Sequence, residues 1–105
     1  MDVEKLVKII QHFECKVRLK HIEDERPEAW ATGIIIPVPG YIELHGPWPI
    51  REVEWLEIDP IVMEHIGRLV APRRINNLAL LEAELREGNI AYTISEEIIR
   101  VPLYA

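Results

Sequence analysis

The chain has 105 residues, of which 49% are hydrophobic and 29% charged, and its formal net charge is −6. This length predicts a single domain, residues 1–105, that buries one hydrophobic core without disulfides or metal ions. The negative charge opposes binding to nucleic acids and to anionic membranes, so neither is expected as a partner.

The N-terminal region predicts a helix followed by a strand. Asp2 is a suitable N-cap, and apolar residues at helical spacing form one stripe of a helix that ends near Phe13. From Cys15 to Ile22 apolar and polar residues alternate, which predicts a half-buried strand. The outer face of this strand carries Lys16, Arg18 and Lys20, which we interpret as a solvated basic row that protects a sheet edge.

The middle of the chain predicts an antiparallel meander of three strands. We expect these strands at Trp30–Ile36, Tyr41–His45 and Glu52–Pro60. Pro39 and Gly40 suit the central positions of a type II turn between the first two strands. Pro47 and Pro49 hold Trp48 in a stiff loop before the third.

The segment Glu52–Pro60 predicts the central strand of the fold. Alternation places Val53 and Trp55 on one face, with Leu56 and Ile58 on the other, so hydrophobic character changes face within the strand. A β-bulge explains this change, because one extra residue re-aims every side chain after it. A strand that passes from one packing layer into another explains it equally.

The C-terminal part predicts an irregular segment, a helix and a hairpin. Residues 61–75 mix helix and strand signals, and we expect an irregular excursion that ends in a short strand. Asn76 or Asn77 then caps a helix that ends at Gly88 in a left-handed conformation. A hairpin follows around Ser95-Glu96-Glu97. The whole is an α+β domain with a mostly antiparallel sheet: N-terminal helix, strand meander, second helix and C-terminal β-hairpin.

The run Val53–Pro60 resembles a segment of a family of small, uncharacterised bacterial domains. Members have a Glu-Trp-Leu/Ile-Glu-Ile core, then a helix, a segment similar to Asn89–Ile94 and a final strand similar to Ile99–Val101. The resemblance covers the C-terminal half, with a weaker match at Lys16–Lys20. This chain departs from the pattern in its hairpin turn, where glycine is usual, and at Leu103-Tyr104, where members tend to have Gly-Tyr. The resemblance implies an α+β domain without an established activity.

Location and redox setting follow from simple patterns. The N-terminus shows no signal-peptide pattern, and the longest apolar run, Ile34–Val38, is too short to cross a membrane, so a cytoplasmic location is expected. Cys15 is the only cysteine, which excludes an intramolecular disulfide and a cysteine-rich zinc site. Its inward register predicts a small buried side chain rather than a nucleophile activated by His12 or His21.

No catalytic motif is present, and no cofactor is predicted. The chain lacks a nucleophile elbow, a glycine-rich phosphate loop and a His-Glu-x-x-His sequence. Candidates for a metal or acid–base site are His45, Glu57, Asp59 and His65, although their spacing matches no dedicated motif. A metal-assisted hydrolase that uses His45, Asp59 and His65 is one alternative function. An anion or nucleotide site is the other alternative. It would use Lys16, Arg18 and Lys20 or Arg68, Arg73 and Arg74. A solvated face is favoured for the first group, and salt bridges to the chain's own carboxylates are favoured for the three arginines.

A non-catalytic protein-interaction module is the function that the sequence favours. A tryptophan held between two prolines beside an acidic strand suits a contact surface, because tryptophan is enriched among interface hot spots. The predicted binding residues are Tyr41, His45, Trp48, Glu52 and Glu54. One form is an acidic, immunity- or antitoxin-like inhibitor that covers a basic enzyme surface. The other is a self-associating domain, such as a homodimer.

Overall fold

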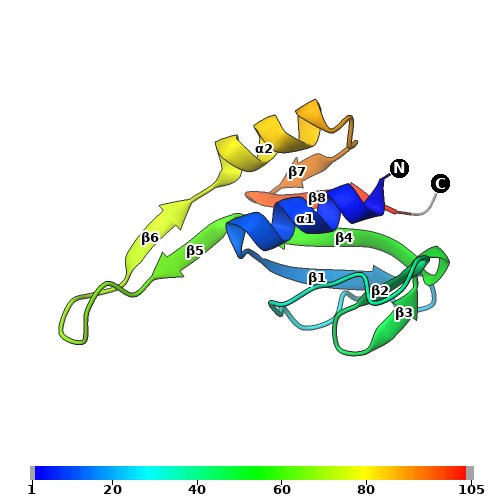
Figure 1. The fold of residues 1–105 in the computed structure, drawn as a ribbon, viewed down its shortest axis with the longest axis horizontal. Helices are drawn as coiled ribbons and strands as arrows, with labels where there is room; N and C mark the ends of the chain where they lie inside the picture. Colours follow the sequence, from blue (N-terminus) through cyan, green and yellow to red (C-terminus); the bar gives the residue numbers. More distant parts are fainter. Residues whose placement is uncertain (1, 104–105) are drawn as a thin grey trace.

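The computed structural model describes residues 2–103 and shows an α+β fold of two helices and three antiparallel sheets (Figure 1). The elements are α1 (Val3–Phe13), β1 (Lys16–His21), β2 (Tyr41–Glu43), β3 (Pro47–Pro49), a 3-10 turn (Ile50–Glu52), β4 (Val53–Asp59), β5 (Ile61–Glu64), β6 (Arg73–Asn76), α2 (Leu78–Glu87), β7 (Thr93–Ser95) and β8 (Ile98–Pro102). Within residues 2–103 no helix is long and apolar enough to cross a membrane. Tyr104, the second residue of the Leu103-Tyr104 pair noted above, lies outside the described residues.

Helix α1 forms where its cap and apolar stripe predict it. The Asp2 carboxylate accepts a hydrogen bond from the Lys5 backbone N–H at 3.0 Å, which satisfies one free donor of the first turn. Glu14 ends the helix in a left-handed conformation with φ 55°. The buried side of α1 consists of Leu6, Val7, Ile9 and Ile10. This helix contacts α2, and both close the core over one face of the main sheet.

The main sheet has the strand order β1-β4-β8-β7, so β4 is an interior strand, as predicted. Leu56 of β4 lies between Leu19 of β1 and Val101 of β8, and all three side chains are buried. Because alternate residues of a strand share a face, the residues between them point to the opposite side of the sheet. The sheet therefore has one apolar face toward the helices and one polar face.

A register shift in the central strand decides between the two explanations of its change of face in favour of a bulge. Trp55 pairs with Lys20, whereas Val53 pairs with His21, so β4 contains one extra residue, Glu54, relative to β1. In a regular strand Val53 and Leu56, three residues apart, would lie on opposite faces. The extra residue reverses this alternation, so Val53 is buried on the same side as Leu56. The change of face noticed in the sequence is thus a bulge at the start of β4.

The expected three-strand meander is wrong. Residues 30–36 make only isolated bridges, at Ala31 and Ile35, because Gly33 at φ 83° interrupts the extended chain. β2 pairs instead with Pro47–Pro49, the expected loop, in a separate two-stranded sheet. A short strand at a sheet edge accommodates two prolines because it needs few backbone donors. The turn before β2 is as predicted: the Tyr41 N–H donates to Val38 O at 3.2 Å, and Gly40 has φ 86°.

Residues 61–76 form a hairpin arm rather than an irregular excursion. β5 pairs with β6 from Ile61↔Asn76 to Glu64↔Arg73. The arm projects away from the body (Figure 1), and the whole molecule, arm included, is 44 Å long. Pro60 does not start a helix, because the Asp59 carboxylate accepts from the Ile61 N–H at 3.0 Å and Pro60 O accepts from the Asn77 N–H at 2.9 Å. Both bonds hold the base of the arm extended.

The C-terminal helix and hairpin agree with prediction except at one cap. Asn77 precedes α2 as its N-cap residue, and the side chain of Asn76 accepts from the Leu78 N–H at 3.0 Å. Gly88 has φ −81°, so the left-handed position expected there falls on Asn89 instead, with φ 55°. The hairpin turn places Glu96 and Glu97 at φ 52° and 66°, the pattern of a type I′ turn, whose twist matches the flanking strands.

Candidate functional site

The polar face of the main sheet is organised around a buried carboxylate. Glu57 is only 3% exposed, and Arg18 donates to its Oε1 through Nε at 3.1 Å and Nη2 at 2.8 Å. Trp55 Nε1 donates to Oε2 at 2.6 Å, and Arg100 Nη2 lies 3.6 Å from the same oxygen. Both carboxylate oxygens therefore have partners, which is the condition for burying such a charge.

Aromatic rings complete this network. The Arg18 guanidinium lies 4.3 Å from the centre of the Trp30 ring, and Arg100 lies 4.0 Å from that of Trp55. Lys20 binds the Glu54 carboxylate at 2.7 Å and is buried. The expected solvated row is therefore wrong for Arg18 and Lys20, because cross-strand acids and rings cover them. Both pair instead with carboxylates of the chain itself.

A pocket of about 530 Å³ opens at the end of the sheet where β1 finishes and β4 begins. Its lining is His21, Ile22, Glu23, Asp24, Glu28, Trp48, Arg51 and Glu52. The His21 ring meets the Trp48 ring edge-on, with centroids 4.7 Å apart, and its Nε2 contacts the Glu28 carboxylate. The Trp48 side chain is fixed by a hydrogen bond in which its Nε1 donates to Leu44 O at 3.0 Å.

The loop 22–28 brings these side chains together by following β1. The Ile22 N–H donates to Glu52 O at 2.9 Å, and the Glu28 N–H donates to Leu19 O at 2.9 Å. The loop thus leaves β1 beside β4 and returns along the free edge of β1. This return places the Glu28 carboxylate against His21, the last residue of β1.

The chemistry of this pocket favours a cation with an apolar part. Four carboxylates and one guanidinium give the lining a formal charge of −3 with His21 neutral. The half-buried Trp48 and the exposed Ile22 add apolar surface. No serine, threonine or cysteine is among the lining residues, so the pocket has no hydroxyl or thiol nucleophile of its own. We name it the acidic pocket.

Of the five predicted binding residues, the structure brings two into the acidic pocket. Trp48 and Glu52 line it, whereas Tyr41 is exposed on β2 and Glu54 is bound to Lys20. His45 is exposed, and its Nε2 lies 3.1 Å from Ala29 O. Sequence reasoning missed His21, Glu28 and Arg51 as site residues. Their meeting depends on backbone hydrogen bonds of the loop, which leave no pattern in the sequence.

The structure does not assemble the predicted metal ligands. Among residues 2–103 no group of three or more histidine, cysteine or acidic side chains is placed to hold a metal ion. Asp59 is engaged with the Ile61 N–H, and His65 follows β5 on the arm, whereas His45 follows β2. These candidate residues lie in or beside separate sheets and do not form a common site.

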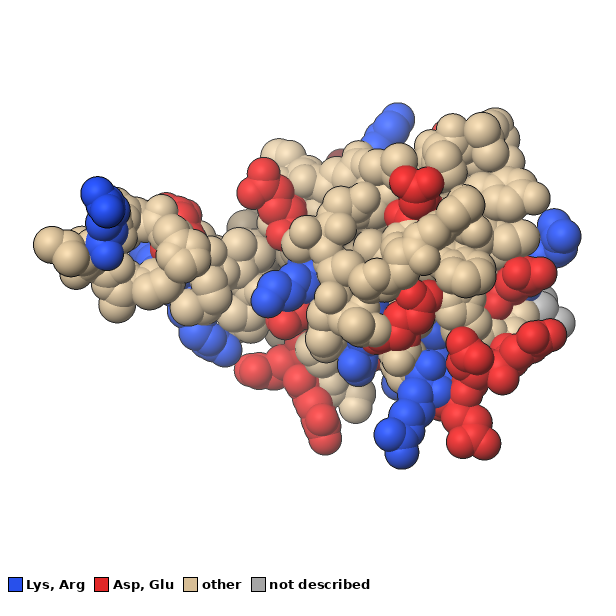
Figure 2. All heavy atoms as spheres, turned by 90° about the horizontal axis from the view of Figure 1, so that it is seen from below, with Lys and Arg blue, Asp and Glu red and all other residues tan. Residues whose placement is uncertain are grey.

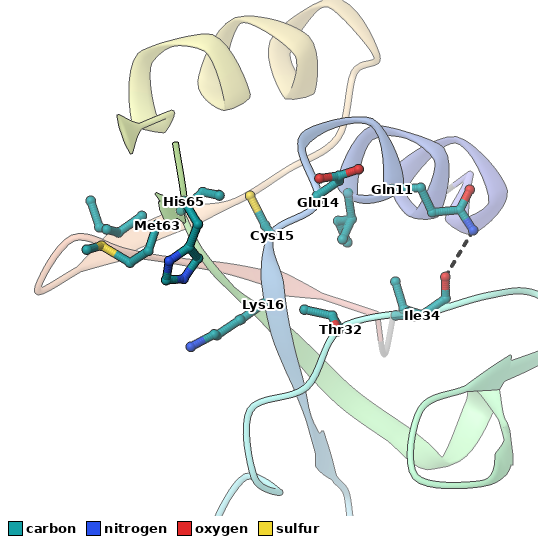
Figure 3. A pocket seen from close by; sticks show the side chains of 12 residues that line it. Gln11, Glu14, Cys15, Lys16, Thr32, Ile34, Met63 and His65 are labelled. Atoms are coloured by element: carbon teal, nitrogen blue, oxygen red, sulfur yellow. Dashed lines mark hydrogen bonds between the residues drawn. The ribbon is translucent and has the colours of Figure 1, made fainter. Parts of the chain in front are cut away.

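Cys15 faces a second pocket, of about 590 Å³, between the end of α1, the loop 32–34 and the base of the arm (Figure 3). Its side chain is 2% exposed, which confirms the buried role predicted for it. Burial raises the pKa of the Cys15 thiol from 9.0 to about 11, and the charge of Asp59 adds to the increase. At neutral pH the thiol is protonated, and Cys15 is therefore a poor nucleophile.

This raised pKa predicts a pH-dependent loss of stability that Cys15→Ser should reduce. The folded chain holds the thiol proton more tightly than the unfolded chain does, so the contribution is fully present below pH 9.0 and is lost as the pH rises to about 11. By linkage the loss amounts to roughly 2–3 kcal/mol. Urea unfolding across this pH range should show a steeper decrease for the wild type than for Cys15→Ser; parallel curves would contradict the assignment.

The β5–β6 arm is the second candidate surface. Four of its apolar side chains are at least half exposed, and Leu69 is exposed at 101%. The others are Met63, Ile66 and Val70. Residues 61–76 have a formal charge of +2, because they contain three arginines (Arg68, Arg73 and Arg74) and one acid (Glu64). The whole chain carries −6, so the rest of it carries −8. Figure 2 shows the arm as a tan and blue projection from a body with many acidic groups.

One comparison with known proteins gives a match. A family model described as "Family of unknown function (DUF6678)" matches residues 2–105. The resemblance to an uncharacterised family is thereby confirmed, and it extends over nearly the whole chain rather than the C-terminal half alone. No curated protein and no solved structure matches the chain.

Proposed function

The chain belongs to this family of unknown function, and we propose that it is a protein-interaction module whose contact element is the β5–β6 arm. The observation that carries the proposal is the fully exposed Leu69 at the end of a hairpin that stands clear of the body. An isolated two-stranded hairpin gains little stability from its own contacts. Apolar side chains exposed on such a hairpin therefore indicate a surface that a partner covers.

The composition of the arm supports a protein partner. Interface centres are enriched in methionine and arginine, and the arm carries Met63 beside three arginines. One of these, Arg73, is paired with Glu64 at 3.0 Å, while no ion pair among residues 2–103 involves Arg68 or Arg74. The arm therefore offers both apolar area and cationic groups to a binding surface.

Two forms of this module follow from the charge distribution. A self-associating chain would use the basic arm and the acidic body together. An immunity- or antitoxin-like inhibitor would bind a basic enzyme through the apolar side chains of the arm, while carboxylates of the acidic body accelerate encounter. The two forms differ in the identity of the protein that contacts residue 69.

Site-specific photocrosslinking in the native host tests the proposal. A photoreactive phenylalanine analogue at position 69 should give a discrete protein adduct, because this position would lie inside the interface. The matched control is position 80, since Leu80 is another exposed leucine but lies on α2. Mass spectrometry of the adduct identifies the partner.

Three results would contradict the proposal. Absence of any adduct at position 69 would remove the arm as a contact element. Equal adducts at positions 69 and 80 would indicate collisions rather than an interface. An adduct that nuclease treatment removes would replace the protein partner with a nucleic acid.

A further inference from the structure

We infer that the arm binds a second copy of this chain, with its tip in the acidic pocket of that copy, so that two copies exchange arms in a closed dimer. This inference rests on the proposed function and adds the identity of the partner. It joins the two surfaces that internal packing leaves unused: the arm, and the pocket formed by the 22–28 loop, Trp48 and Glu52.

Charge complementarity is the first argument. The arm carries a formal charge of +2, and the lining of the acidic pocket carries −3 with His21 neutral. Opposite patches attract partners and fix their orientation, while like patches repel. Because the rest of the chain carries −8, two bodies repel each other unless the arms lie between them. The arm is an exposed segment whose charge favours approach to a second body.

Chemical complementarity is the second argument. The pocket combines an indole, Trp48, with carboxylates such as Glu23 and Asp24. An arginine side chain suits this combination, because a guanidinium stacks on an aromatic face and pairs with carboxylates. The arm places Arg68 directly before the exposed Leu69, so one tip presents a guanidinium and an apolar group together.

The placement of the two surfaces is the third argument. The pocket lies where β4 begins, beside Glu52, and the arm leaves β4 where it ends, at Asp59 (Figure 1). The arm therefore cannot reach the pocket of its own chain. If a two-fold axis that crosses β4 relates two copies, each arm meets the pocket of the other copy. Such a contact is reciprocal and closes at two copies.

A charge-reversal experiment tests the inference. The first variant, Arg68→Glu with Arg74→Glu, makes the arm acidic while its own pocket stays acidic. The second variant, Glu23→Lys with Asp24→Lys, makes the pocket more basic while its own arm stays basic. Each variant alone should be monomeric, because arm and pocket then have charges of the same sign. A mixture of the two should form a one-to-one dimer, because each arm again meets a pocket of opposite charge.

Sedimentation velocity of the purified chain is the measurement, with circular dichroism to confirm that each variant is folded. We expect a wild-type dimer whose dissociation constant increases with salt, and each reversal should increase that constant by more than about tenfold. The control for the second variant is Glu84→Lys with Glu87→Lys on α2, which raises the net charge by the same amount but lies outside both surfaces and should leave the dimer intact.

Several outcomes would overturn the inference. A wild-type chain that stays monomeric at every concentration, or a mixture that does not restore the dimer, removes the second copy as the partner. Species that grow beyond two copies remove the closed arrangement. The proposed function fails separately, when position 69 gives no protein adduct in the host. A monomeric chain with a different protein crosslinked at position 69 overturns only the inference.

Discussion

Replacing Glu57 by alanine is expected to lower the free energy of unfolding by about 2–4 kcal/mol, as measured by urea or thermal denaturation. The substitution removes the acceptor shared by the side chains of Arg18, Trp55 and Arg100. The two guanidinium groups keep partial access to water, with side-chain exposures of 29% and 44%, so the effect is smaller than for a fully buried charge.

Glu54→Ala is the matched control for this effect. Glu54 also binds a cation of β1, but its side chain is 38% exposed and accepts from Lys20 alone, so its removal should cost less than that of Glu57, which has three partners. Equal losses for Glu54→Ala and Glu57→Ala would show that burial of the carboxylate is unimportant. Glu57→Gln should fall between the wild type and Glu57→Ala, because the amide keeps one acceptor oxygen.

Leu56→Ala is expected to reduce stability by about 3–4 kcal/mol, because it opens a cavity in the centre of the core. Leu56 is completely buried on the interior strand, between Leu19 and Val101. Small domains unfold with a total of about 5–15 kcal/mol, so the variant should show a large decrease in its unfolding midpoint.

Leu80→Ala serves as the control for the cavity effect. Leu80 is 59% exposed on α2, and its truncation should change stability by no more than about 0.5 kcal/mol. Circular dichroism with denaturant measures both variants under the same conditions. A loss for Leu80→Ala as large as that for Leu56→Ala would contradict the assignment of the core to the helix-covered face.

The elements that were predicted correctly are those whose patterns are local. The cap at Asp2 and its apolar stripe specify α1 within a few residues, and alternation specifies β1 and the C-terminal hairpin. The bulge in β4 was also visible, because one extra residue shifts the apolar pattern within a single strand. Each of these patterns arises because one face of the helix or strand is buried and the other is not.

The arm could not be predicted, because the body covers only its base, where Val62 packs against the core. Exposed strands lack the alternation that reveals a half-buried strand, and the exposed Ile66 and Leu69 lie in the loop between β5 and β6 rather than in either strand. Likewise, Pro47 and Pro49 argue against any strand, and only the pairing with Tyr41–Glu43 shows that β3 exists. Contacts between distant segments decided both cases.

The site was predicted only where one residue dominates it. The flanking prolines singled out Trp48, and the acidic stretch after them contains Glu52. His21 and Glu28 come from the end of a strand and from a loop that returns beside it, so their contact depends on tertiary hydrogen bonds. The same limit applies to Arg18 and Glu57, whose pairing depends on the register between β1 and β4.

The place of β4 between β1 and β8 has a consequence for the order in which the protein folds. The first neighbour of β4 lies more than thirty residues earlier in the chain, and the second nearly forty residues later. During synthesis, α1, β1 and β4 can associate first, but the second edge of β4 has no partner until Ile98–Pro102 has emerged. Pairings this distant slow folding and expose apolar strands in the interval. The central strand that completes the sheet is therefore also the strand most open to wrong partners while the chain is being made.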